Sequence, residues 1–259
     1  MHLVDSHCHL DFTNFEKDFG AVLARAAEVG VTKIINPGVD LSTSRKAVAL
    51  TESVNPRVNS GVNLFAAVGF HPSEAEKLSA DNFAALEQLA QNSKVVAIGE
   101  IGLDFFKNQK SAKVQIAAFE RQLALAQRLN RPVIIHSRAA DAEIFASLDK
   151  FQVRGVFHCF GSDWDFAEQV LARGFLIGLT GIVTFANAVN VQEVARKTPL
   201  EKILIETDAP FLAPQKFRGE RCEPAFVIEV AQKIAELKNL SLEEIAVQTS
   251  QNAEELFRI

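Results

Sequence analysis

The chain lacks the features that typically mark membrane and secreted proteins. No apolar run in its 259 residues approaches the ~18 residues that a membrane span needs. We expect no signal peptide, because no basic segment followed by a long apolar stretch opens the chain. The three cysteines, Cys8, Cys159 and Cys222, form no C-x-x-C pair, and an odd number argues against a disulfide framework. These absences predict a protein of the reducing cytoplasm that does not associate with membranes.

The chain also lacks an excess of basic residues. Its 27 lysines and arginines against 32 acidic residues give a net charge of −5 at pH 7, with histidine neutral. A protein that coats long nucleic acid needs a broad basic surface, so the charge argues against this class. An enzyme that grips one strand end locally remains possible. The acidic balance and the short predicted loops together predict a monomer.

What is present is a regular alternation of short apolar runs with amphipathic segments. The runs are mostly rich in Val or Ile and bounded by Gly, Pro or polar residues, which predicts strands. The eight predicted strands are Leu3–Asp5, Lys33–Asn36, Leu64–Phe70, Val95–Glu100, Pro132–His136, Gly155–His158, Phe175–Leu179 and Ile203–Glu206. Apolar residues at three-to-four spacing predict helices at Phe15–Val29, Ser42–Val54, Asp81–Asn92, Lys113–Leu129, Ala139–Phe151, Asp163–Arg173, Val189–Lys197, Pro224–Leu237 and Leu242–Phe257.

Eight strands that alternate with helices predict a (β/α)8 TIM barrel. The alternative is an open doubly wound sheet, which typically has a Gly-rich phosphate loop after the first strand. The sequence Asp-Ser-His-Cys-His occupies that place instead. Because no repeat, low-complexity tract or linker interrupts the pattern, we expect one domain over residues 1–259.

This Asp-Ser-His-Cys-His sequence is a candidate metal site. In an extended segment alternate side chains share a face, so Asp5, His7 and His9 would point one way. Two imidazoles and a carboxylate at one point suit a divalent transition metal. Hydrogen-bonded histidines at a buried strand end are the alternative.

The remaining histidines and several carboxylates also follow predicted strands. Five of the six histidines lie at strand C-termini: His7, His9, His71, His136 and His158. His2 is the exception, and we interpret it as structural. Glu100 lies at the end of the fourth strand, and the eighth runs into Glu206 and Asp208. Because barrel active sites lie at the C-terminal ends of strands, this distribution favours a metal site over scattered core histidines.

Together these motifs resemble those of the TatD family of metal-dependent hydrolases and deoxyribonucleases, within the amidohydrolase superfamily. The resemblance covers residues 5–210 and extends to a further motif at residues 218–224. It rests on the His-x-His pair, Gly-x-His-Pro, Gly-Glu-Ile-Gly-Leu-Asp, the strand-five histidine, His-Cys-Phe and Glu-Thr-Asp-Ala-Pro. It implies a metallo-dependent hydrolase barrel that uses two divalent ions to cleave ester bonds.

The resemblance also implies a ligand set. One ion would be held by His7, His9, Glu100 and Asp208, and the second by Glu100, His136 and His158. Glu100 would bridge the ions, since two cations ~3.5–4 Å apart repel unless an anion lies between them. Histidines favour Zn²⁺ or Mn²⁺, whereas the carboxylates and phosphate chemistry also permit Mg²⁺.

Several residues near these ligands have two candidate roles. Asp208 can be a metal ligand and the general base for the attacking water, or alternatively a helix N-cap. Asp5 is a candidate for orienting a histidine, and Glu206 for the same role or for a buried ion pair. His71 would contact a substrate phosphate or a metal-bound water, or would fix the turn before Pro72.

On the substrate side, Arg138, Arg218 and Arg221 are predicted phosphate grips, because the planar guanidinium suits phosphate. A solvated loop is the alternative for the last two, and Lys107 and Lys110 would extend a basic rim. Aromatic side chains in the same loops would stack a nucleobase or pack in the core. These are Phe105, Phe106, Phe160 and Phe217.

The leading hypothesis is a two-metal phosphodiesterase acting on DNA, single-stranded or near a strand end, or on a small phosphate ester. Hydrolysis of a small ester, lactone or amide is the alternative, because related barrels cleave such bonds. A metal-binding scaffold with vestigial activity is a further alternative. Three departures from the family pattern lie on the substrate side: Phe105 and Phe106 replace an aromatic hydroxyl, Cys222 replaces Asn, and Gly161-Ser162 reverses the usual order.

Overall fold

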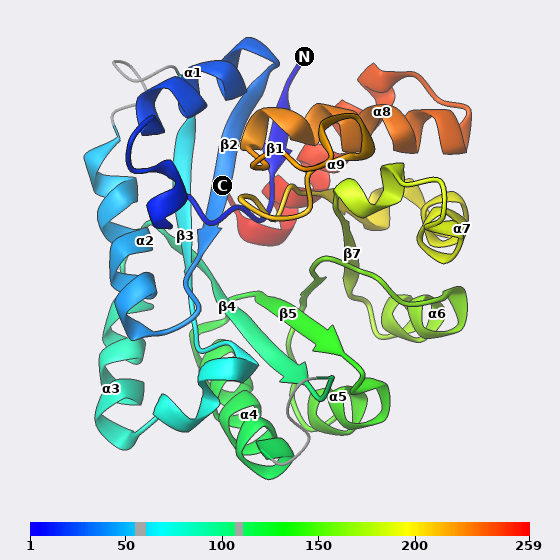
Figure 1. The fold of residues 1–259 in the computed structure, drawn as a ribbon. Helices are drawn as coiled ribbons and strands as arrows, with labels where there is room; N and C mark the ends of the chain where they lie inside the picture. The colour runs from blue at the N-terminus through cyan, green and yellow to red at the C-terminus, as the bar shows by residue number, and fades with distance from the viewer. Residues whose placement is uncertain (55–60, 107–110) are drawn as a thin grey trace.

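The computed structural model describes residues 1–54, 61–106 and 111–259, and within them eight parallel strands form one sheet (Figure 1). The strands are β1 (Leu3–Asp5), β2 (Val31–Pro37), β3 (Asn63–Val68), β4 (Val95–Asp104), β5 (Val133–Arg138), β6 (Gly155–Phe157), β7 (Leu176–Leu179) and β8 (Ile203–Ile205). They pair in sequence order from β1 to β8, as repeated β-α units with right-handed crossovers require. The predicted eight-stranded α/β architecture is therefore confirmed.

The sheet curls into a barrel that is nearly closed between β8 and β1. The backbone N–H of Ser6 donates to the carbonyl of Ile205 at 3.1 Å, and that of Asp208 donates to the carbonyl of His7 at 2.9 Å. Cys8 and Ala209 form an isolated parallel bridge. The segments that close the barrel are thus those that follow β1 and β8.

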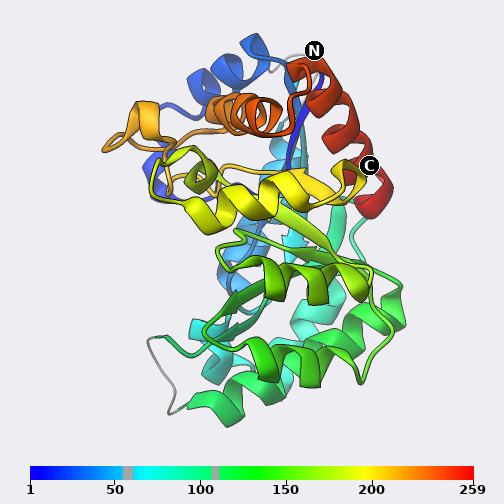
Figure 2. The ribbon, with the colours of Figure 1, turned by 90° about the vertical axis from the view of Figure 1, so that its right-hand side faces the viewer.

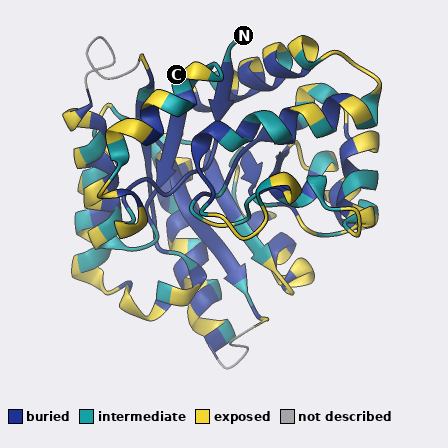
Figure 3. Ribbon diagram, turned by 45° about the horizontal axis from the view of Figure 1, so that its top comes forward, coloured by how far each residue is buried: buried dark blue, intermediate teal, exposed yellow. Residues whose placement is uncertain are grey.

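Helices surround the sheet, as Figures 1 and 2 show from two directions. They are α1 (Phe19–Glu28), α2 (Leu41–Ser53), α3 (Ala80–Leu89), α4 (Ala112–Leu129), α5 (Asp141–Leu148), α6 (Trp164–Ala172), α7 (Val189–Lys197), α8 (Val227–Lys238) and α9 (Leu242–Phe257). Their inner faces are buried and their outer faces exposed, as the colouring of Figure 3 shows. Among the described residues, no helix combines the length and apolar character needed to cross a bilayer.

Two apolar clusters form the core. The larger cluster lies between the sheet and the helices. The smaller one fills the barrel interior with residues from all eight strands, and the end of α9 contributes Leu256 and Phe257 to it. Phe257 is only 1% exposed, so α9 closes the end of the barrel at which the strands begin.

Several predicted boundaries differ from the structure by a few residues, and two of these differences have a clear backbone cause. The predicted strand Val95–Glu100 continues to Asp104, because Gly102, Leu103 and Asp104 pair with an equally extended β5, so Glu100 lies inside the strand. The predicted helix over residues 139–151 begins only at Asp141, because Ala139 has a left-handed φ of 53° that a helix cannot contain.

Candidate metal centre

The predicted metal ligands from five parts of the chain converge at the C-terminal ends of the strands. His7 and His9 follow β1, Glu100 lies on β4 and His136 on β5. The other two follow β6 and β8, and they are His158 and Asp208. Four of the six are buried, with exposures of 0% for His7, 3% for His9, 4% for Glu100 and 6% for His158. The site is therefore a recessed cluster of imidazoles and carboxylates.

Glu100 reaches the centre of this cluster because β4 is irregular there. The register between β4 and β5 shifts between Ile98 and Ile101, and such bulges often re-aim a side chain at an active site. The backbone N–H of Glu100 donates to the carbonyl of Gly38 instead of to β5. Two residues later, Gly102 has a φ of 144°, and a Cβ there would lie 1.9 Å from the carbonyl oxygen of His136. Only glycine therefore allows β4 and β5 to approach so closely beside the site.

The two carboxylate oxygens of Glu100 face different histidines. Oε1 lies 2.9 Å from Nδ1 of His136 and 2.9 Å from Nε2 of His158. Oε2 lies 3.5 Å from Nε2 of His7 and 3.8 Å from Nε2 of His9. Glu100 therefore stands between two pairs of imidazoles and presents one oxygen to each.

Asp208 completes the group around His7 and His9. Its Oδ1 lies 3.6 Å from Nε2 of His7 and 3.5 Å from Nε2 of His9, while the two Nε2 atoms are 3.2 Å apart. The backbone of Asp208 has a φ of 55°, a left-handed conformation that Asp tolerates better than most residues. Burial opposes ionisation of Asp208, but the contact with His9 and the charge of His158 keep its pKa below the usual range.

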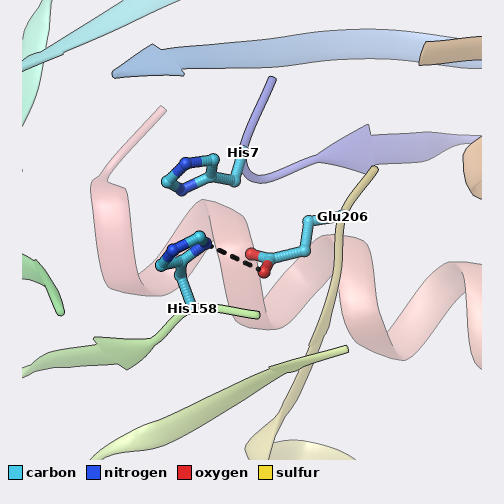
Figure 4. A group of neighbouring side chains, drawn as sticks. All are labelled: His7, His158 and Glu206. Carbon is cyan, nitrogen blue, oxygen red and sulfur yellow. Dashed lines mark ion pairs between the residues drawn. The ribbon is translucent and has the colours of Figure 1, made fainter. Parts of the chain in front are cut away.

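Glu206 contacts His158 from the side opposite Glu100. Its Oε1 lies 3.4 Å from Nδ1 of His158, and the imidazoles of His158 and His7 stack at 3.9 Å (Figure 4). Glu206 is fully buried and also accepts from the backbone N–H of Cys159 and the hydroxyl of Ser6. Gly178 leaves space for it, because a Cβ there would lie 2.6 Å from Oε2 of Glu206. Glu206 can thus hold the His158 ring in one orientation.

Asp5 has different contacts from those predicted for it. Its carboxylate accepts from the backbone N–H of Thr207 at 3.0 Å and from the Thr207 hydroxyl at 2.6 Å. It also accepts from the backbone N–H of His7 at 3.3 Å, and within the described residues no hydrogen bond or ion pair joins it to an imidazole. Asp5 therefore joins the segments after β1 and β8 and positions the His7 backbone.

The site has the chemistry that a divalent cation needs. Buried ring nitrogens are usually hydrogen-bonded, yet Nδ1 of His7, both ring nitrogens of His158 and Nε2 of His136 have no such partner among the described residues. His158 Nε2 is close to Glu100 without hydrogen-bond alignment. Burial opposes ionisation of Glu100, but the charges of His158 and His71 and the contact with His136 hold its pKa well below the usual range. Anionic carboxylates beside unpaired imidazoles suit metal coordination better than a hydrogen-bond network.

The possible ligand groupings overlap. Within the described residues, three sets have donor atoms close enough to share an ion: His7 with His9 and Glu100, His7 with His158 and Glu206, and His71 with Glu100 and His136. His71 therefore lies closer to the cluster than a purely substrate-contacting role requires. Its Nε2 is 3.6 Å from Oε1 of Glu100, and its Nδ1 accepts from the backbone N–H of Ser73, which fixes the turn after β3. Burial lowers the pKa of His71 to about 4, so it is neutral at pH 7 and can act as a donor ligand.

Asp104 is a site residue that sequence reasoning missed as a partner of His136. Its Oδ2 lies 3.6 Å from Nε2 of His136, and this contact lowers the pKa of Asp104 to about 2. The signal was its place in the Gly-Glu-Ile-Gly-Leu-Asp motif, four residues after Glu100, on a strand that continues further than expected.

The three predicted phosphate-gripping arginines have different surroundings. Arg138 is exposed at the end of β5, with its guanidinium 4.0 Å from the centre of the Phe106 ring. Arg218 is exposed and lies over Phe185 at 5.7 Å. Arg221 instead makes a bidentate ion pair with Asp18, at 2.8 and 2.7 Å. Of these three arginines, Arg138 and Arg218 have no ion-pair partner among the described residues, whereas Arg221 has one.

The surface loops also contain aromatic side chains that the sequence did not single out. Phe12 stacks on His9 with ring centres 4.8 Å apart, and Phe211, which is 51% exposed, lies 6.0 Å from Phe12. Each follows a predicted ligand by three residues, which was the available signal. Of the aromatic residues predicted to face substrate, Phe105 and Phe160 are buried, Phe217 stacks on Phe226 and Phe106 is 65% exposed. Lys107 and Lys110 lie outside the described residues.

Comparisons with known proteins agree with this geometry. The sequence model of the family described as TatD related DNase matches residues 4–258. The uncharacterized metal-dependent hydrolase YabD of Bacillus subtilis (strain 168) is 38% identical over 260 residues, covering 99% of each chain. The 3′-5′ ssDNA/RNA exonuclease TatD of Pantoea vagans (strain C9-1) is 35% identical over 265 residues, covering 99% of this chain and 100% of the relative.

Among solved structures, the TatD homologue YjjV of Escherichia coli K12 superposes with a TM-score of 0.91 at 35% identity. The match covers 99% of this chain and 98% of that chain. The similarity therefore extends over the whole barrel, including every segment that carries a candidate ligand.

Proposed function

Since this chain belongs to the TatD-related DNase family and is a metal-dependent hydrolase, we propose that it cleaves phosphodiester bonds at the end of single-stranded nucleic acid, using two divalent ions. The observation that carries the proposal is the placement of Glu100, with Oε1 toward His136 and His158 and Oε2 toward His7 and His9. A carboxylate placed in this way can bridge two cations. A single-ion site would need only one of these two groups.

In this proposal His7, His9 and Asp208 hold one ion, His136 and His158 hold the other, and Glu100 contacts both. The bound ions would lower the pKa of a water and stabilise the negative charge that develops on the phosphate oxygens. Their identity among Zn²⁺, Mn²⁺ and Mg²⁺ is left to experiment.

The protein groups perform the remaining steps. Asp208 uses Oδ1 toward the His7 and His9 side, and its other oxygen can accept the proton of the attacking water. Its depressed pKa keeps it ionised and ready to act as a base at neutral pH. Neutral His71 beside Glu100 is placed to contact a phosphate oxygen or the water, and Arg138 can neutralise the phosphate charge from the end of β5.

A groove beside the metal centre can hold the nucleic-acid strand. It has a volume of about 380 Å³, lies between the loops after β6 and β7, and begins at Gly161, three residues after His158. Phe185 lines it, and Arg218 lies over that ring, so one nucleobase can stack while a guanidinium meets the adjoining phosphate. Exposed Phe211 and Phe106 offer further stacking faces at the rim.

The test is cleavage of end-labelled single-stranded DNA and RNA by metal-stripped protein, with Mg²⁺, Mn²⁺ or Zn²⁺ added back separately. Stepwise shortening from the 3′ end, the polarity named for the Pantoea relative, is expected only with metal. Glu100→Gln should remove it, whereas Glu193→Gln, which changes a carboxylate on the outer face of α7, should not.

Two bound ions per chain without cleavage of any nucleic acid would refute the nuclease proposal. The same site would then be tested on small phosphate esters, lactones and amides. Binding of a single ion would refute the two-metal part alone.

A further inference from the structure

A second group of positive charges lies at the end of the barrel opposite the metal centre. Arg131, Arg154 and Arg258 line a cavity of about 360 Å³. Arg131 and Arg154 come just before β5 and β6, and Arg258 follows α9, which covers this end of the barrel. The cavity is thus at the N-terminal ends of the strands, and the candidate metal ligands are at or near the C-terminal ends.

These three guanidinium groups are not neutralised by the protein. Across residues 1–54, 61–106 and 111–259 no carboxylate forms an ion pair with any of them, whereas Arg25 and Arg221 are paired. Nη1 of Arg154 donates to Oδ1 of Asn130 at 3.1 Å, but its Nη2 is buried with no hydrogen-bond partner in the same described ranges. A buried donor without an acceptor costs free energy, and an acceptor from a ligand would remove that cost.

The charges also repel one another. Burial lowers the pKa of the Arg154 guanidinium, and the neighbouring charge of Arg258 lowers it further. In the described part of the chain no carboxylate counteracts this repulsion, so a bound anion would relieve it.

The shape of the cavity restricts the ligand. Val96, Leu129 and Phe257 contribute apolar walls, and Val96 and Phe257 belong to the apolar cluster inside the barrel. Charge recognition is therefore concentrated on the arginines. We propose that this cavity binds a phosphate-bearing anion, which the forked donors of Arg131, Arg154 and Arg258 fit better than a lone ammonium would. Three positive charges favour a doubly or more highly charged ligand such as pyrophosphate or a phosphomonoester.

The test is calorimetric titration of the metal-free chain with pyrophosphate. One saturable equivalent is expected for the wild type, and at least about tenfold weaker binding for Arg154→Gln and for Arg258→Gln, since each removes a charge-assisted hydrogen bond. Arg45→Gln is the matched control. Arg45 is exposed in the first turns of α2, hence at the other end of the barrel, and its loss should change the affinity less than about twofold.

Equal affinities of Arg154→Gln and Arg45→Gln, or no saturable binding by the wild type, would overturn the proposal. Arg258 is exposed, so Arg258→Gln keeps the test decisive if Arg154→Gln unfolds, which thermal melting will show. Parallel titrations with inorganic phosphate and AMP separate two sources. If pyrophosphate binds most tightly, the ligand is a free inorganic anion. If AMP binds most tightly, the ligand has an organic part that contacts Val96 and Leu129. Because nuclease activity is not measured, this result is independent of the proposed function.

Discussion

The two ends of the barrel treat buried charge differently. Where the strands end, carboxylates and imidazoles are packed together, and Glu100 lies within 2.9 to 3.8 Å of five histidine rings. Where the strands begin, Phe257 and its neighbours form an apolar plug, and the arginines stand at its edge without carboxylate partners in the described chain. The C-terminal ends of the strands therefore carry the polar groups for chemistry, and the N-terminal ends provide apolar burial that stabilises the fold. Mutations at the two ends should separate activity from stability.

Glu100→Gln at the strand ends should have the largest effect of any single change. It removes the anion between the two imidazole pairs, so we expect metal-dependent cleavage to fall more than about 100-fold, since loss of even an outer partner costs 10–100-fold. The unfolding midpoint of the metal-free protein should not fall. Cleavage assays and thermal melting check both points. Retention of more than a tenth of the activity would contradict the ligand assignment.

Phe257→Ala at the opposite end should reverse that pattern. Truncating a fully buried aromatic ring leaves a cavity, and we expect a loss of about 3–5 kcal/mol in the free energy of unfolding. Activity per folded molecule should stay near that of the wild type. Urea denaturation gives the free energy of unfolding. The cleavage rate divided by the concentration of metal-binding sites, which titration with metal gives, is the activity per folded molecule. A large loss of turnover in fully folded protein would contradict the idea that one end of the barrel determines activity and the other stability.

Glu206→Gln tests how one side chain supports the metal centre without being a necessary ligand. Removing its charge beside His158 should weaken binding of the ion on the His158 side by about 10–100-fold. Competition with a chromophoric chelator measures this affinity directly. Glu229→Gln, which breaks the ion pair with Lys216 on the outer surface, is the control and should leave it unchanged. If both variants bind metal equally, Glu206 is part of the packing only.

Asp18→Asn should have the smallest effect, because its partner Arg221 is partly exposed. The pair with Arg221 lowers the pKa of Asp18 to about 2, so its contribution to stability is present above the ordinary pKa near 4 and is lost as the pH falls from about 4 to about 2. Screening by water limits that contribution to less than about 1 kcal/mol. Urea unfolding of the wild type and the variant should differ at pH 7 and converge toward pH 2.

The same variant sharpens the role of Arg221. Asp18→Asn removes the bidentate partner of Arg221, which then keeps only the Asn14 carbonyl at 2.6 Å and Glu223 at 3.8 Å, so a lowered KM for single-stranded DNA would support the predicted phosphate grip. An unchanged KM, with Arg221→Gln equally silent, would make the pair purely structural.

Local patterns were enough to predict most of the architecture. Short Val- and Ile-rich runs predicted all eight strands, and the polar residues after them predicted a metal site, because barrel geometry brings strand ends together. The resemblance to the TatD family then selected six of those residues as ligands. The C-terminal boundary of β4 could not be predicted from local composition. Its glycines and Glu100 have the composition of a strand terminus, and only pairing with β5 shows that the strand continues to Asp104.

Contacts between distant segments were beyond the reach of the sequence. Asp18 captures Arg221, 203 residues away, and no local pattern distinguishes that pair from a free phosphate grip. The arginines before β5 and β6 were overlooked for another reason. They precede their strands, and the starts of parallel strands gather at one end of a barrel just as the strand ends gather at the other.

The seam between β8 and β1 determines when the protein can first become active during its synthesis. His7 and His9 are made about 200 residues before Asp208, and they meet it only after β8 has been made and has docked. The contacts that close this seam, such as Asp5 with Thr207, join residues 202 positions apart. A nascent or truncated chain that ends before β8 therefore lacks Asp208, one of the six proposed ligands, and has an open barrel. Because the seam and Asp208 are both missing from such a chain, we expect no hydrolytic activity from it until β8 has been made and has docked.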